Sequence, residues 1–328
     1  MHMRTPSSSA HGLTLVELLV AMTLGLLITL AAVAALLVGQ QGFRSIDAAS
    51  QVRDNTRFAS DIMRRVILQA GYLSPQFAID RGHGFALNNA TPSEPSIKGF
   101  NNASYSQSLV IGTTNTVPSS ARGVNNSDML VVRYQVGRAI TDGVSDRSMI
   151  NCLGNTETTT PDTPDERLFS VFHVSNTLRG EPALMCTWRN ETNGTWQTQP
   201  LIEGVERLQI LYGTQNVIAN TAPASLSDTA ATPPPDRYLR ADQLVVAGDD
   251  VATNANWERV RAIRIGLVVR GASGSAPTTA NAPAIHPFGS ASLGSANDPG
   301  TQPGTPNDNR LRQIASFTVH LRNAQSTQ

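Results

Sequence analysis

An uninterrupted apolar stretch near the start of the chain is the strongest feature in the pattern of apolar and polar positions. From Leu13 to Gly39 the sequence reads LTLVELLVAMTLGLLITLAAVAALLVG, in which Glu17 is the one charged residue. The 22 residues from Leu18 to Gly39 carry no charge. As a helix they would extend about 33 Å, enough to cross the hydrocarbon core of a bilayer. We therefore predict a transmembrane helix over residues 13–39, preceded by a short polar leader, residues 1–12.

The helical pattern continues beyond the apolar stretch. No proline occurs between Gln40 and Ala70, and Phe58, Ile62 and Val66 fall on one face of a helix at i, i+4 and i+8. Gly71 is a plausible C-cap, and Pro75 blocks further helix. We expect one helix from about Leu13 to Ala70, in which residues 40–71 form an amphipathic continuation.

Beyond Gly71 the apolar positions alternate with polar ones, which is typical of β-strands with one buried face. The alternation is clearest in Val205–Tyr212 and Val260–Arg270. The other candidate strands are Leu109–Gly112, Met129–Val136, Leu168–Val174, Ala183–Arg189, Trp196–Ile202 and a last run through Phe317, Val319 and Leu321. The pattern predicts antiparallel strands in a single layer, covered by the apolar stripe of the helix. The fold class is α+β.

Long stretches rich in Thr, Ser, Ala, Asn, Gly and Pro interrupt the strand pattern. Loops of this length are either functional or mobile. We expect one β-rich globular domain over residues 72–328, with flexible insertions at 214–256 and 271–309, and we favour mobile surface segments over ordered binding loops.

Composition and motifs exclude several classes of function. Lys plus Arg and Asp plus Glu both number 25, so the chain lacks the broad positive field of non-specific nucleic-acid binding, and no nucleic acid is expected. The sequence contains no phosphate-binding loop, dinucleotide-binding turn, hydrolase elbow or HExxH helix. His173 and His320 lie in strand patterns, where a structural role is favoured over catalysis. We predict no enzyme, no cofactor and no metal, with calcium binding by the Asp- and Asn-rich loops as the alternative.

Three interpretations of the N-terminal segment compete. A secretory signal peptide would have an apolar region of about 7–15 residues ending in an A-x-A site. Ala32-Val33-Ala34 fits such a site, but the apolar run is too long and continues past it. A plain membrane anchor explains the length but not Glu17, because a carboxylate near the bilayer centre costs about 2.5–3.5 kcal/mol and marks a functional site by default.

The third interpretation accounts for the glycine, the apolar tail, the lone glutamate and the short leader together. The string Gly12-Leu13-Thr14-Leu15-Val16-Glu17 resembles the prepilin signal, in which a cytoplasm-facing peptidase cuts after the glycine. The resemblance implies cleavage between Gly12 and Leu13 and N-methylation of Leu13. Leu13 stands where that family most often has phenylalanine, and an apolar residue meets the same need.

Glu17 has a physical role in this interpretation. In a bundle of such helices, a buried carboxylate must find a positive partner or stay protonated. Cleavage creates that partner, the new α-amino group of a neighbouring subunit. We expect a salt bridge between the two groups to set the axial register of each added subunit.

Blocks near the C-terminus sharpen the resemblance. LIEGVERLQILYG at 201–213, VRAIRIGLVVR at 260–270 and RLRQIASFTVHLRN at 310–323 are similar to the PilW family of minor pilins. NCLG at 151–154 and the second cysteine also fit that family. Outside the cytoplasm, Cys152 and Cys186 would form one disulfide, whereas in the cytosol two free thiols would be favoured.

The resemblance implies an inner-membrane protein with a cytoplasmic N-terminus and a periplasmic domain, incorporated into a type IV pilus near the tip. Its implied partners are other minor pilins, the major pilin, the prepilin peptidase and the inner-membrane assembly platform, and its implied role is to prime pilus assembly. The alternatives are a minor pseudopilin of a type II secretion system and a pilus-borne adhesin or DNA-uptake module.

Overall fold

The computed structural model describes most of the chain. The described residues are 14–78, 94–107, 115, 117, 119–139, 144–158, 160–163, 165–191, 193–225, 234–276, 284–289, 294–302 and 308–323. The chain divides into two compact units, residues 1–47 and residues 48–328. Each unit is described by itself below.

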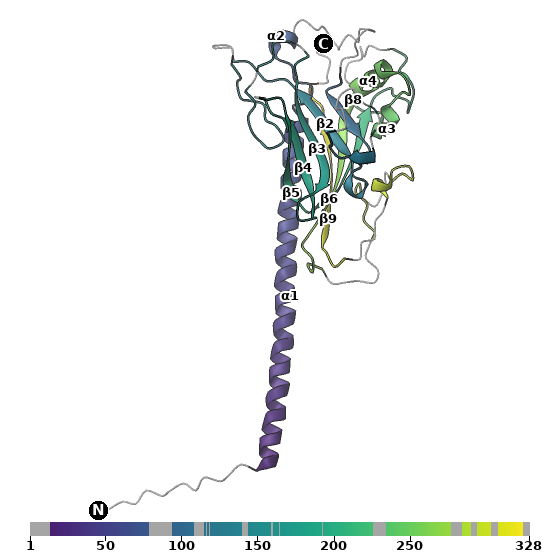
Figure 1. Ribbon diagram of the computed structural model, residues 1–328. Helices are drawn as coiled ribbons and strands as arrows, with labels where there is room; N and C mark the ends of the chain where they lie inside the picture. The colour runs from purple at the N-terminus through teal and green to yellow at the C-terminus, as the bar shows by residue number, and fades with distance from the viewer. Residues whose placement is uncertain are drawn as a thin grey trace, which may run out of the picture. The chain divides into compact units, whose positions relative to one another are not determined.

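One long helix, α1 (Leu15–Ile67), begins in the first unit and ends in the second. Figure 1 shows it as a single unbroken helix. Residues 68–71 form turns after its last helical residue, and Gly71 adopts a positive φ of 73° that only glycine takes up readily. The short helix α2 (Pro75–Ala78) follows. The predicted helix is confirmed, and the processing residue Leu13 lies outside the described residues.

Nine strands in two antiparallel sheets form the rest of the framework of the second unit. The first sheet has the order β1-β2-β3-β4-β5, and the second has the order β7-β6-β8-β9. Their bounds are β1 (Ile97–Phe100), β2 (Met129–Tyr134), β3 (Leu168–Asn176), β4 (Pro182–Arg189), β5 (Trp196–Glu203), β6 (Val205–Thr214), β7 (Arg237–Leu239), β8 (Val260–Arg270) and β9 (Arg312–His320).

Gly204 marks the point at which the chain leaves the first sheet and enters the second. It has a φ of 88°, and a Cβ at this position would lie 2.6 Å from the carbonyl oxygen of Arg270. Its amide donates to the Pro182 carbonyl, which begins β4, over 2.8 Å, while its carbonyl accepts from the Arg270 amide, which ends β8, over 2.7 Å. One glycine therefore links both sheets through its backbone.

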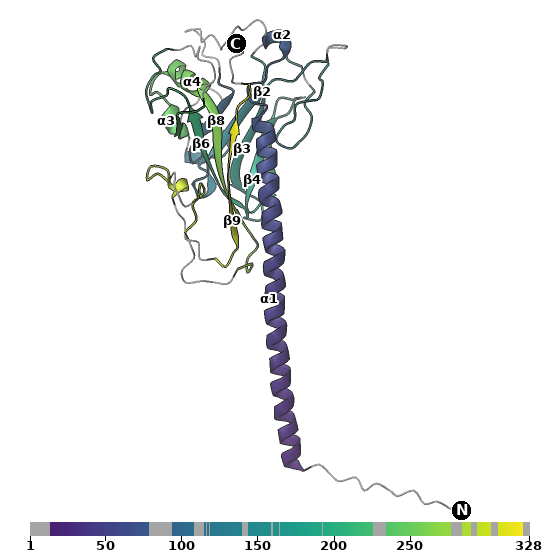
Figure 2. The same ribbon diagram turned by 180° about the vertical axis from the view of Figure 1, so that it is seen from behind.

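The core of this unit lies between the second part of α1 and the inner faces of the two sheets. Buried side chains of the helix, the first sheet and the second sheet belong to one apolar cluster. Its members include Val52, Ala59, Met63, Val66, Leu130, Phe172, Leu184, Ile210, Ile265 and Val319. Figure 2 shows this part of the helix alongside the strands. The predicted cover of the sheets by the apolar stripe is therefore present.

The last residues of the domain hold the end of the helix. The Asn323 side-chain amide donates to the carbonyls of Leu68 at 3.3 Å and Ala70 at 3.2 Å, which lie just past the last helical residue. The guanidinium of Arg64 lies 4.6 Å from the centre of the Phe317 ring on β9. Residues of the C-terminal strand and its tail thus stabilise the C-terminal end of α1.

The strand predictions and the structure differ in three places. Two sheets are present where a single layer was expected. Leu109–Gly112 lies outside the described residues. The segment expected to be one long insertion, 214–256, carries β7, α3 (Ala241–Leu244) and most of α4 (Asp250–Glu258), because Leu239, Leu244 and other apolar side chains of this segment enter the core. Short 3-10 turns complete the fold: η1 (Ser119–Ala121), η2 (Val124–Asn126) and η3 (Pro299–Thr301).

Candidate functional site

The first turn of α1 holds Glu17 in a capping box. The Glu17 carboxylate accepts from the Thr14 backbone amide at 2.9 Å and from the Thr14 hydroxyl at 3.0 Å, while the Glu17 amide donates to that hydroxyl at 3.3 Å. The Thr14 carbonyl accepts the first helical hydrogen bond, from the Leu18 amide. Thr14 is thus the N-cap and Glu17 the third helical residue, which satisfies backbone groups that a helix start leaves unpaired. A negative charge here also complements the helix dipole.

The first unit exposes an apolar helical surface. Large apolar side chains between Leu15 and Val38 are 51–76% exposed. The helix is long and apolar enough to cross a membrane by length and composition. Exposure of so many apolar groups to water is strongly unfavourable, at roughly 25 cal/mol per Å². This surface therefore requires lipid or the apolar faces of partner helices.

The predicted processing residues and the predicted acid have different standings. Gly12 and Leu13, and the whole leader 1–12, lie outside the described residues. The structure places Glu17 one turn into the helix, in the apolar surface and beside the backbone that follows Leu13 directly. Its carboxylate is near the chain position at which cleavage would expose a new amine.

Cys152 and Cys186 are joined by a disulfide, with their Cα atoms 5.6 Å apart. Both residues are fully buried. Closing a loop of this length stabilises a fold by about 3–4 kcal/mol in the chain-entropy model. The loop at Cys152 also contacts the end of α1, because Ile150 and the Gln69 side chain exchange two hydrogen bonds of 2.8 and 2.9 Å. The disulfide therefore fixes a loop against which the helix end is held.

A pair of glutamates lies near the disulfide. Glu157 is 6% exposed, and Glu191 accepts from the Thr158 amide and hydroxyl at 2.6–3.1 Å. Burial raises the pKa of Glu157 to about 7, and the hydrogen bond and charge of Glu191 raise it further than burial alone would. The sequence gave no signal for this pair, because the two residues lie on segments that only the folded chain brings together.

Glu157→Gln is expected to stabilise the protein at pH 8 and to leave its stability unchanged at pH 4. A carboxyl group whose pKa is raised from 4.5 to about 7 on folding binds more protons in the folded state between those values, so stability falls as pH rises through this window. Thermal melts at the two pH values measure the effect, which should be a Tm increase of a few degrees at pH 8. The exposed Glu203→Gln is the matched control, and an equal Tm gain in both variants would contradict the prediction.

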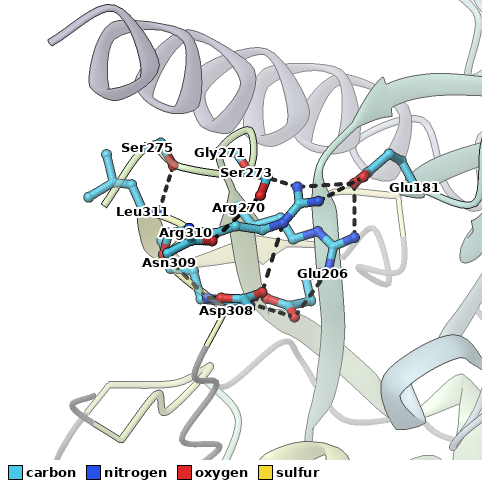
Figure 3. A network of polar contacts seen from close by, with 11 residues as sticks. Glu181, Glu206, Arg270, Gly271, Ser273, Ser275, Asp308, Asn309, Arg310 and Leu311 are labelled. Atoms are coloured by element: carbon cyan, nitrogen blue, oxygen red, sulfur yellow. Dashed lines mark hydrogen bonds and ion pairs between the residues drawn. The ribbon is translucent and has the colours of Figure 1, made fainter. Parts of the chain in front are cut away.

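A network of ion pairs joins the two sheets at one end (Figure 3). Glu181, in the turn between β3 and β4, accepts from Arg270 at 2.8 Å and from Arg310 at 2.9 Å. Glu206 on β6 pairs with Arg312 on β9 at 2.6 Å, and Arg312 also pairs with Asp308. Hydrogen bonds from Arg270 and Arg310 hold the pKa of Glu181 below its usual range. Sequence analysis missed this network, since its members are up to 131 positions apart, from Glu181 to Arg312.

His173 has the contacts of a structural residue. It is 1% exposed, and its Nδ1 and Nε2 lie 2.9 Å from the Ser104 and Thr187 hydroxyls. Burial lowers its pKa to about 3, so the ring is neutral at physiological pH. Within the described residues, no group of three or more His, Cys, Asp or Glu side chains is placed to hold a metal ion.

Comparisons with known proteins give two family matches. Residues 171–323 match the family described as type IV pilus-assembly protein W. Residues 7–33 match the prokaryotic N-terminal methylation motif, which includes Gly12, Leu13 and Glu17. No curated protein matched the chain. Among solved structures, the type IV-like pilin TTHA1219 from Thermus thermophilus is similar, with 13% identity, a TM-score of 0.37, and coverage of 84% of this chain and 97% of that chain.

The two family matches occupy the parts of the chain that carry the site and the strands. The methylation motif spans the leader, the cleavage position and the start of α1, and the second match runs from β3 to Asn323. Together they imply membrane anchoring, processing by a prepilin peptidase and pilin partners. The chain is therefore a type IV pilin-like protein of the PilW family.

Proposed function

We propose that this protein is a minor pilin that primes type IV pilus assembly together with other minor pilins. The observation that carries the proposal is a helix surface that is exposed, apolar and marked by a single carboxylate, Glu17, in its first turn. A plain anchor has no need of that carboxylate. A subunit that must dock at one fixed height does need such a group.

Cleavage after Gly12 would leave Leu13 with a free α-amino group next to the capping box. We propose that Glu17 of one subunit binds this amine on a neighbour. The pair would lie among apolar helices, where a carboxylate without a partner is costly. Thr14 holds Glu17 in the unassembled subunit, so the acid already has two hydrogen bonds before it meets the amine.

The apolar surface also explains how a membrane protein becomes part of a fibre. We propose that the helix is stored in the inner membrane with the domain in the periplasm, and that the assembly platform extracts it into a bundle of pilin helices. The apolar side chains then leave lipid only to contact other apolar side chains, which lowers the cost of extraction. Priming places this subunit early in the fibre and therefore near its tip.

Deletion of the gene tests the priming role. We expect surface pili to fall at least about tenfold while the major pilin stays in the inner membrane, and wild-type complementation to restore them. Pili are counted by electron microscopy, and export of secreted enzymes is measured in parallel. Normal piliation with lost secretion would contradict the proposal in favour of a secretion pseudopilin, and normal piliation with lost adhesion or DNA uptake would favour a pilus-borne binding module.

A further inference from the structure

Two buried aspartates that are far apart in sequence meet at the junction of the two sheets. Asp128 precedes β2, Asp298 precedes η3, and each is only 2% exposed. Adjacent residues hold them: the Asn102 amide donates to Asp128 Oδ1 at 3.0 Å, and the Asn101 side chain donates to Asp298 Oδ2 at 3.1 Å. Asp128 Oδ2 also accepts from the Ile210 amide on β6 at 2.8 Å. No hydrogen bond joins the two carboxyl groups.

The surroundings leave this pair short of positive charge. Burial raises the pKa of Asp128 well above its usual range, and the charge of Asp298 raises it further. Burial likewise raises the pKa of Asp298, against the opposing effect of Arg240. Arg240 itself binds Asp242 through two hydrogen bonds of 2.9 Å and Ser295 through a third. Two buried like charges need protons or a shared cation.

An independent observation points to a cation. Three buried oxygen atoms of this cluster have no hydrogen-bond partner: Asn102 Oδ1, Gln209 Oε1 and Asp298 Oδ1. All three are acceptors. The orientation of Gln209 is set by its other amide atom, because Nε2 donates to the Asn126 carbonyl at 2.7 Å. Buried polar groups are almost always satisfied, so acceptors gathered around two carboxylates indicate a missing positive partner.

Gly300 shows how closely the Asp298 turn packs on β6. A Cβ at Gly300 would overlap the Gln209 side-chain amide and the Asn126 carbonyl. Only glycine allows this approach. The turn at 298–301 is thereby held against the strand that carries Gln209 and Ile210, and the five oxygen-bearing side chains of the cluster come from three separate regions of the chain.

We propose that Asp128, Asp298, Asn102 and Gln209 form a binding site for a hard divalent cation, Ca²⁺ in preference to Mg²⁺. Carboxylate and amide oxygens are the ligands that Ca²⁺ takes in proteins, in sets of six to eight with flexible geometry, whereas Mg²⁺ demands a near-ideal octahedron. Nitrogen and sulfur ligands, which other metals favour, are not part of the set. The cation ties the loop after β1, the start of β2 and the turn at η3 to the edge and face of β6.

Calcium binding to the full-length protein in detergent micelles tests this site. After chelator treatment, isothermal titration with CaCl₂ should show one ion per chain, with MgCl₂ at least about tenfold weaker, and CaCl₂ should raise Tm by several degrees. Asp298→Asn should abolish the heat signal. Asn102→Gly should weaken Ca²⁺ binding at least about tenfold, and it keeps the backbone relaxed because Asn102 has a positive φ of 49°. The exposed Asp61→Asn on α1 is the control and should bind as wild type does.

Folding and binding can be separated in this experiment. If Asp128 and Asp298 are merely a protonated buried pair, Asp298→Asn would raise Tm equally with chelator and with CaCl₂, and wild type would give no saturable heat with CaCl₂. Either result would overturn the proposal. So would unchanged Ca²⁺ affinity in both Asp298→Asn and Asn102→Gly. The intact disulfide and the far-ultraviolet circular dichroism spectrum show that each variant is folded.

Discussion

Gly12→Leu is expected to accumulate as an uncleaved precursor whose first residue is Met1. The methylation motif places the cut between Gly12 and Leu13. Glycine lacks a Cβ, so the backbone before the scissile bond can approach the peptidase closely, and a leucine side chain would block that approach. N-terminal sequencing and intact mass of the protein from membranes measure the outcome, and we expect at least about a tenfold loss of cleaved product.

Gly42→Leu is the matched control for this substitution. Gly42 lies in α1 with open space around the position of a Cβ, so the same change there should leave cleavage complete. The precursor form of Gly12→Leu should remain in the membrane and be absent from sheared pili. A Gly12→Leu protein that still begins at Leu13 would show that the cut does not depend on this glycine.

Glu17→Ala is expected to be cleaved and inserted in the membrane but to enter pili at least about tenfold less than wild type. Removing one partner of a buried ion pair costs about 3–5 kcal/mol, because the other charge is left without compensation. Here that charge is the α-amino group of a neighbouring subunit. Immunoblots of sheared pili and of membranes, normalised to the major pilin, measure incorporation and retention separately.

Two further variants separate ion pairing from helix capping. Thr14→Ala removes the hydroxyl of the capping box but keeps the carboxylate, and the loss of a cap costs about 1 kcal/mol. Glu17→Gln keeps a hydrogen-bonding side chain but has no charge. We expect Thr14→Ala to assemble nearly as wild type and Glu17→Gln to fail as Glu17→Ala does. Equal defects in Thr14→Ala and Glu17→Ala would instead show that capping is the role of this residue.

The parts of the fold that the sequence predicted are those with a long, regular pattern. The helix from Leu15 to Ile67 and strands such as β6 and β8 have enough turns or alternations to identify their period. β1 was missed because it has four residues, all buried, with no alternation. β7 and α3 are equally short, and tertiary packing rather than local propensity stabilises elements of this length.

The division into two sheets was not readable from the sequence. β5 and β6 are separated by Gly204 alone, a spacing that favours a hairpin within one sheet. The two strands belong to different sheets because Gly204 bonds to β4 on one side and to β8 on the other. Such a choice depends on strands that come from both earlier and later in the chain.

The same reasoning applies to the candidate site. Glu17 was identified because its partners lie within one turn and its apolar surroundings are local. The cysteine pair was identified because the residues are only two in number, and the structure brings them together. The cluster of Asp128 and Asp298 spans 170 positions, so neither the charge deficit nor the unpartnered oxygens leave a mark on any short stretch of sequence.

The way in which Asn323 and Phe317 hold the end of α1 has a consequence for biogenesis. The helix is made first, but the residues that secure its buried stripe are made last. During export the stripe around Val66 must wait, without its full cover, until β9 has crossed the membrane and closed over it. Native structure at the helix end then reports that translation and translocation are complete. A truncated nascent chain lacks that closure, which exposes it to periplasmic proteases before it can enter a fibre and stop its growth.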